Sequence, residues 1–110
     1  MTKPEPLVAA LAELAARGQT VTYGKLARAL AIPGPGSIAR LAQALEALMD
    51  ADAAAERPLR AVLCSGRLQG GLPASGFFAK AAQLGRYAGP TQGPEAEAFV
   101  ARERAALFKC

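Results

Sequence analysis

The chain contains no histidine and no tryptophan, and only two of its 110 residues are cysteines. Without histidine it lacks the commonest general base, the usual serine and cysteine triads, and the ligand of most zinc sites. The cysteines, Cys64 and Cys110, are far apart in the sequence and lack metal-ligand spacing. Neither an export signal nor a bilayer-spanning apolar run is visible. We therefore expect a cytoplasmic, non-enzymatic protein with reduced thiols, without cofactor, metal or membrane contact.

Aromatic residues make up only 5% of the chain, although 52% of its residues are hydrophobic. About a quarter of all residues are alanine, which buries little surface. The core must therefore come from a short set of larger aliphatic side chains and a few phenylalanines. The low aromatic content disfavours binding of single-stranded nucleic acid by base stacking. The length fits one domain, and this composition favours a small, mainly helical one.

Apolar residues at helical spacing predict five helices, and glycine or proline residues mark most of their ends. We expect them from the prolines at positions 4 and 6 to about 17, from about 23 to 31, from 37 to about 54, from 75 or 76 to 84, and from 94 towards 109. Ser37 is expected to cap the third helix. Ile38 is expected in the apolar stripe of that helix, together with Leu41.

Two short segments between the helices have β character. Residues 19–22 suit one edge of a small sheet, and alternation over residues 59–65 predicts a strand. A glycine-rich turn and a very short return strand at 72–73 would complete a β-hairpin. This order of elements is typical of a winged helix-turn-helix. We therefore expect an α+β, mainly helical domain over residues 1–110, with a winged-helix core at about 5–74 and a C-terminal helical extension at about 75–108.

The segment VTYGKLA at residues 21–27 resembles the start of the helix-turn-helix in O6-alkylguanine-DNA alkyltransferases and alkyltransferase-like proteins. The resemblance covers about residues 20–68 and implies a DNA-binding winged helix. It places Tyr23 where the family's tyrosine helps to displace a DNA phosphate during base flipping. The family's Pro-Cys-His-Arg motif aligns with PLRA at residues 58–61. Leu59 therefore stands where the family has its nucleophilic cysteine, and the histidine is absent. The recognition-helix arginine falls on Ala39. Alkyl transfer is therefore not expected.

A second resemblance concerns the C-terminal part of the chain. The segment GGLPASGFF at residues 70–78, followed by LGRY at 84–87, is similar to a small uncharacterised proteobacterial family of winged-helix-like proteins. This resemblance implies a bacterial protein and a fold, and it implies no chemistry.

The basic residues indicate a nucleic-acid partner. The chain has 13 basic and 9 acidic residues, a formal net charge of +4. Helical spacing places Ser37, Arg40 and Gln43 on one face of the third helix, where they could reach phosphates and base edges. Basic residues of the preceding helix and of the expected wing could hold phosphates. The predicted nucleic-acid-binding residues are Tyr23, Lys25, Arg28, Ser37, Arg40, Gln43, Arg60 and Arg67.

Two hypotheses for function follow. The first is a non-enzymatic module that binds duplex DNA through the N-terminal half of the third helix and the wing. Glu46, Asp50 and Asp52 would repel a phosphate backbone along the C-terminal half of that helix. The second is a winged-helix protein-interaction module without DNA binding, which presents an apolar patch including Phe77 and Phe78 or dimerises through the fifth helix. Cys64 is expected to be a small core residue rather than a nucleophile, like most buried free cysteines.

Overall fold

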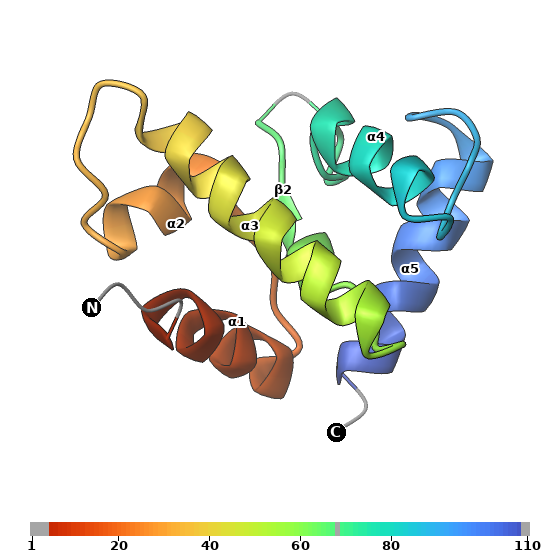
Figure 1. Cartoon of the computed structure of the whole chain (residues 1–110), viewed down its shortest axis with the longest axis horizontal. Coiled ribbons are helices and arrows are strands. Elements are labelled where there is room, and N and C mark those ends of the chain that lie inside the picture. Colours follow the sequence, from red (N-terminus) through yellow and green to blue (C-terminus); the bar gives the residue numbers. More distant parts are fainter. Residues whose placement is uncertain (1–4, 68, 109–110) are drawn as a thin grey trace.

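The long third helix is the element around which the other helices are arranged (Figure 1). The computed structural model describes residues 5–67 and 69–108. It confirms a mainly helical chain with a small sheet. The helices are α1 (Glu5–Arg17), α2 (Tyr23–Ala29), α3 (Ser37–Ala54), α4 (Ser75–Gln83) and α5 (Pro94–Phe108). Of the helices in the described ranges, none has both the length and the apolar character needed to cross a bilayer.

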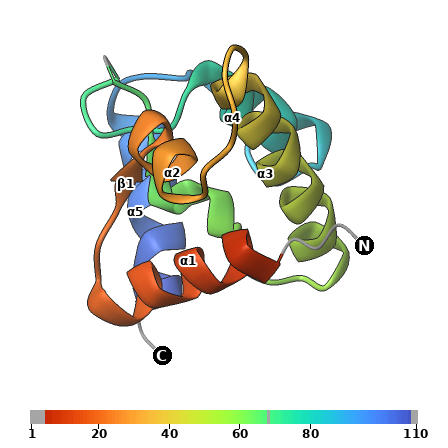
Figure 2. The same cartoon turned by 90° about the vertical axis from the view of Figure 1, so that its left-hand side faces the viewer.

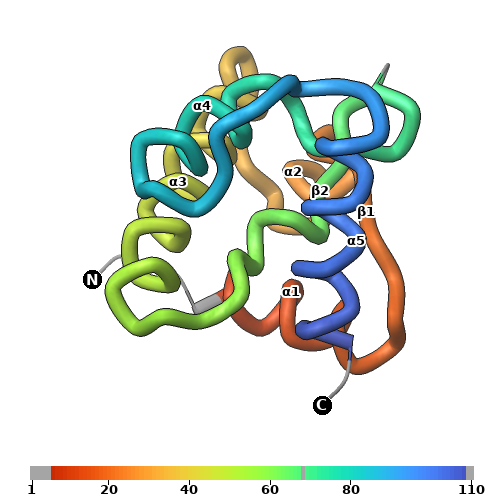
Figure 3. Tube along the Cα trace, turned by 90° about the vertical axis from the view of Figure 1, so that its right-hand side faces the viewer, coloured from red at the N-terminus to blue at the C-terminus, as the bar shows by residue number. Residues whose placement is uncertain are grey.

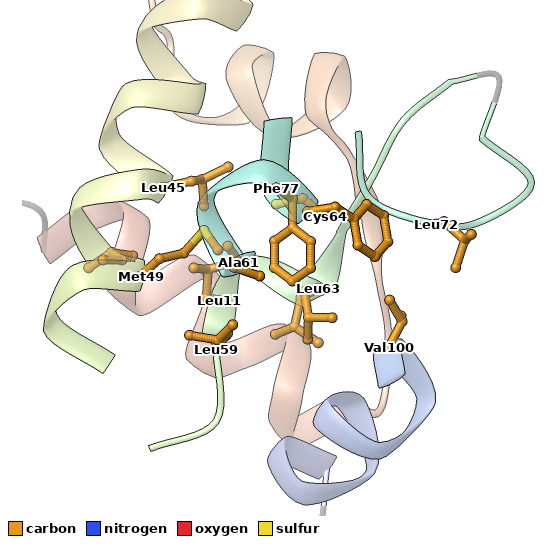
Figure 4. Close-up of a cluster of buried hydrophobic side chains, with 14 of the residues drawn as sticks. Leu11, Leu45, Met49, Leu59, Ala61, Leu63, Cys64, Leu72, Phe77 and Val100 are labelled. Atoms are coloured by element: carbon orange, nitrogen blue, oxygen red, sulfur yellow. The ribbon is translucent and has the colours of Figure 1, made fainter. Parts of the chain in front are cut away.

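Large aliphatic and aromatic side chains from all of these helices meet in one core. Figure 4 shows Leu45 and Met49 of α3 gathered with Leu11 of α1, Phe77 of α4 and Val100 of α5. Each of these side chains is at least nine-tenths buried. The helices α4 and α5 therefore belong to the same core as the N-terminal helices, and their apolar faces are covered by it.

Residues 59–65 do not form the predicted strand. They form a 3-10 helix, η1 (Arg60–Leu63), followed by the two-residue strand β2 (Cys64–Ser65). Every residue from 59 to 65 except Arg60 is buried. A strand directs alternate side chains to opposite faces, which suits a segment covered on one side. This segment passes between α1, α3 and α5 (Figure 3), so successive side chains turn toward different helices and all become buried.

The predicted hairpin is also wrong, because the sheet is parallel. Strand β1 (Val21–Thr22) pairs with β2, with Val21 opposite Cys64 and Thr22 opposite Ser65. After β2 the described residues 66–67 and 69–71 contain turns, which we call the 66–71 loop, and residues 72–73 are not a strand. The N–H of Gly66 donates to the carbonyl of Leu72 (2.9 Å) and closes this loop. The 66–71 loop thus replaces the expected pair of wing strands.

The ends of α2 and α3 differ slightly from the predictions. Helix α2 ends at Ala29 instead of about residue 31, and Ala31 has a left-handed φ of 57°. The N-cap of α3 is Gly36 and not Ser37, and its φ of 83° favours glycine. Ser37 is the first residue of the helix, and the cap residue supplies no side-chain hydrogen bond.

Asp52 is a fully buried carboxylate that ties the end of α3 to η1. Its Oδ2 accepts the backbone N–H of Arg60 at 2.9 Å. Its Oδ1 lies 2.9 Å from the Arg60 guanidinium and 3.1 Å from that of Arg57. A buried carboxylate is stable only when such partners satisfy it. The prediction that Asp52 faces and repels a partner is therefore wrong, since its charge is enclosed by two arginines.

We expect Asp52→Ala to lower the free energy of unfolding by about 3 kcal/mol, because it leaves the partly buried Arg60 without its counter-ion. Urea denaturation followed by circular dichroism measures this loss. The matched control is Asp50→Ala in the same helix, since Asp50 is exposed and pairs with Lys80. The control should cost less than about 1 kcal/mol. Equal losses for the two variants would contradict the role assigned to Asp52.

Candidate nucleic-acid interface

Four of the predicted site residues line one surface hollow. The hollow has a volume of about 720 Å³ and lies between the start of α2, the first turn of α3 and the 66–71 loop. Tyr23, Lys25 and Arg28 line it from α2, and Arg67 lines it from the loop. We call this hollow the basic groove. Figure 2 shows the loop standing beside α2.

The short sheet explains why these segments meet. Because Thr22 pairs with Ser65, the start of α2 and the loop that follows β2 leave the sheet side by side. Thr22 also caps α2, since its Oγ1 accepts the N–H of Lys25 at 3.2 Å. The two-residue sheet therefore sets the position of Lys25 on one side of the basic groove and of Arg67 on the other.

The lining of the basic groove is cationic. Among the described residues that line it, three carry positive charge and none carries a carboxylate; the other lining residues are Thr22, Tyr23, Gly24, Ile38, Gly66, Gln69 and Ala74. Like charges that share a hollow repel one another, and an anion placed between them relieves that repulsion. The arrangement can therefore hold an anion such as a phosphate.

Tyr23 is held in place at its hydroxyl. The hydroxyl oxygen accepts the N–H of Ala74 at 3.0 Å, which links α2 to the segment preceding α4. Burial raises the pKa of Tyr23 to about 12, and the hydrogen bond from Ala74 opposes that effect more weakly. The phenol is therefore neutral at physiological pH. A hydroxyl that accepts one hydrogen bond still has its own proton to donate.

The predicted residues of α3 lie outside the lining of the basic groove. Arg40 and Gln43 are exposed, and Ser37 is half-buried. The Arg40 guanidinium donates to the carbonyl of Pro33, which fastens the first turn of α3 to the turn before it. Ile38 lines the groove instead and is 51% exposed. The prediction that Ile38 belongs to the buried stripe of α3 is therefore wrong.

Arg60 is not at this surface. Its guanidinium and backbone N–H both bind Asp52, and its side chain lines a different hollow beside Ala106 and Leu107 of α5. The prediction that Arg60 contacts a phosphate from a wing rested on a strand that does not form. The 3-10 turn directs this side chain to the end of α3 instead.

Phe77 and Phe78 do not form a surface patch. They are 5% and 2% exposed, and their rings pack edge to face with centroids 5.2 Å apart. The protein-interaction hypothesis that depends on an exposed Phe78 is therefore wrong. Dimerisation through α5 stays a prediction.

Cys64 has the predicted character of a core residue. It is fully buried, and burial raises the pKa of its thiol to about 12, with the charge of Arg104 acting weakly in the opposite direction. A thiol in this state is a poor nucleophile. No cluster of three metal-ligating side chains occurs in the ranges 5–67 and 69–108.

Sequence reasoning missed Ile38 and Gln69 as lining residues of the basic groove. Gln69 lies in a loop without periodicity, so no pattern could have placed its side chain. Comparison of the chain with protein-family models, curated proteins and solved structures found no match. The assignment of the site therefore rests on its geometry and charge.

The pKa of Tyr23 predicts a loss of stability at alkaline pH. The unfolded chain ionises this phenol near pH 10 and the folded protein near pH 12, so the stabilisation is complete below pH 10 and is lost as the pH rises toward 12. We expect Tyr23→Phe to reduce the fall in unfolding free energy between pH 9.5 and about 11.5. Urea denaturation across this range measures it. An unchanged pH dependence in the variant would contradict the burial of the phenol.

Proposed function

We propose that the protein is a non-enzymatic module that binds duplex DNA through the basic groove. The observation that carries this proposal is the convergence of Lys25, Arg28 and Arg67 from two distant segments. No described lining residue offsets their charge. The phosphate backbone supplies most of the affinity in sequence-independent DNA binding, and clustered lysine and arginine side chains are what neutralises it.

The residues of the basic groove can contact a DNA strand in different ways. The guanidinium groups of Arg28 and Arg67 can each bind two oxygens of one phosphate, whereas Lys25 acts as a point charge. Tyr23 and Gln69 add neutral donors beside these charges. Such contacts fix the position of the protein on the duplex and carry no sequence information by themselves.

In our proposal the exposed side of α3 supplies a second set of contacts, apart from the basic groove. In our proposal α2 and α3 act as a helix-turn-helix, and the 66–71 loop takes the place of a wing, as in a modified winged helix. Arg40 and Gln43 are both exposed, and their side chains can form paired hydrogen bonds with base edges. Asp50 pairs with Lys80 farther along α3, so its charge is partly offset there.

The basic groove predicts a binding that weakens with salt. We expect the protein to bind a 20-base-pair duplex at about 50 mM salt and to lose affinity steeply toward 200 mM, because bound phosphates release counter-ions. Lys25→Ala combined with Arg67→Ala should lower the magnitude of the salt slope by about 2, since two phosphate contacts disappear. Fluorescence anisotropy of a labelled duplex measures both effects. Failure of the wild-type protein to bind at about 50 mM salt would rule out the proposal.

The matched control combines Arg17→Ala with Arg102→Ala. Both double variants lower the formal net charge of +4 by two. Arg17 and Arg102 are exposed on α1 and α5 and do not line the basic groove. A control that loses as much affinity as the groove variant would show that net charge, and not the groove, attracts the duplex. Arg40→Ala, measured alongside, reports separately on the exposed side of α3.

A further inference from the structure

Arg104 of α5 links the end of the 66–71 loop to η1, the turn that precedes β2. Its Nε donates to the carbonyl of Val62, just before β2, at 2.8 Å. Its Nη2 donates to the carbonyl of Gly71, at the end of the loop, at 2.9 Å. One planar guanidinium therefore contacts both η1 and the end of the loop that carries Arg67.

The hydrogen bonds within the loop join residues that are close in sequence. They do not fix the orientation of the loop relative to the helices. Gly66 and Leu72 are linked directly, and the N–H of Leu72 also donates to the carbonyl of Gln69 at 3.1 Å. Gly70 and Gly71 both have left-handed φ angles, and a side chain built at either would meet no atom within 4 Å. These contacts close the loop on itself. The pairing of β2 with β1 attaches the start of the loop to the fold, and the bond from Arg104 to Gly71 attaches its end.

Arg67 needs such an attachment because of its charge. It shares the basic groove with Lys25 and Arg28, so electrostatic repulsion favours movement of the loop away from α2. Hydrogen bonds from Arg104 to backbone carbonyls oppose this movement without adding a carboxylate to the groove. An arginine suits the task, since its Nε and Nη donors are fixed in one plane, whereas a lysine offers a single flexible ammonium group.

We propose that Arg104 is a positioning residue of the basic groove, which holds the loop so that Arg67 acts together with Lys25 and Arg28 on the same stretch of phosphate backbone. This inference rests on the proposed function. Arg104 does not line the basic groove, but in this proposal it raises the affinity of the groove for DNA.

The test is a double-mutant cycle with Arg104→Lys, which keeps the charge, and Arg67→Ala. We expect Arg104→Lys alone to weaken binding of a 20-base-pair duplex roughly 5-fold, as coupled residues of one network do. In the Arg67→Ala background the same change should alter affinity by less than about 2-fold. The control is Arg102→Lys, an exposed arginine on the same helix, which should leave affinity unchanged.

A second measurement does not depend on DNA. In the free protein, Arg104→Lys should speed hydrogen exchange at the backbone amides of Gly66 and Leu72, while the amides of α3 keep their wild-type rates. Unchanged exchange at the loop, or equal losses of affinity with and without Arg67, would overturn the inference. Wild-type protein that does not bind the duplex would instead reject the proposed function, and the exchange rates would still decide whether Arg104 holds the loop.

Discussion

The fold depends on burying the segment from Leu59 to Ser65 in the middle of the helices. This segment supplies the centre of the core, and its last two residues pair with β1. Asp52 secures its start through Arg60, and Glu103 of α5 accepts the N–H of Leu59 at 2.9 Å. A polar backbone can enter an apolar interior only when its hydrogen bonds are satisfied. Glu103 and Asp52 accept the hydrogen bonds of the first two amides of this segment. The position of both sides of the basic groove follows from this burial.

The helices could be predicted from the sequence because their information is local. Leucine spacing and the residues that end helices gave α1 and α3 almost to the residue, and Pro94 marked the start of α5. The segment at 59–65 could not be predicted in this way. Its residues can be divided into two alternating sets, as in a strand, but the segment is buried from several sides and forms a 3-10 turn instead. The parallel pairing of β1 with β2 depends on contacts across the whole chain, so no local pattern contains it.

For the candidate site, too, some residues could be predicted from the local sequence, whereas the positions of others depend on contacts between distant parts of the chain. The family resemblance predicted Tyr23 as a site residue, and charge and expected position predicted Lys25, Arg28 and Arg67; the structure brings these four to one hollow. The same reasoning failed for Arg60, because its position relative to the core depended on the wrongly predicted strand. Ile38 was misplaced because the apolar stripe of α3 does not extend to its first turn, where the helix projects beyond the core. Buried Asp52 could not be told from a solvated aspartate by its neighbours in the sequence.

The bonds from Arg104 have a consequence for the order of events during protein synthesis. The residues that line the basic groove are all made before α5, but the arginine that fixes one of its sides comes from the second half of α5. Helix α5 also packs against α1 and η1, so α1 gains this second packing partner only when the last helix has been made. A growing chain on the ribosome would carry the cations of the groove without their final arrangement. The arrangement of the basic groove is therefore complete only after the second half of α5 has been made.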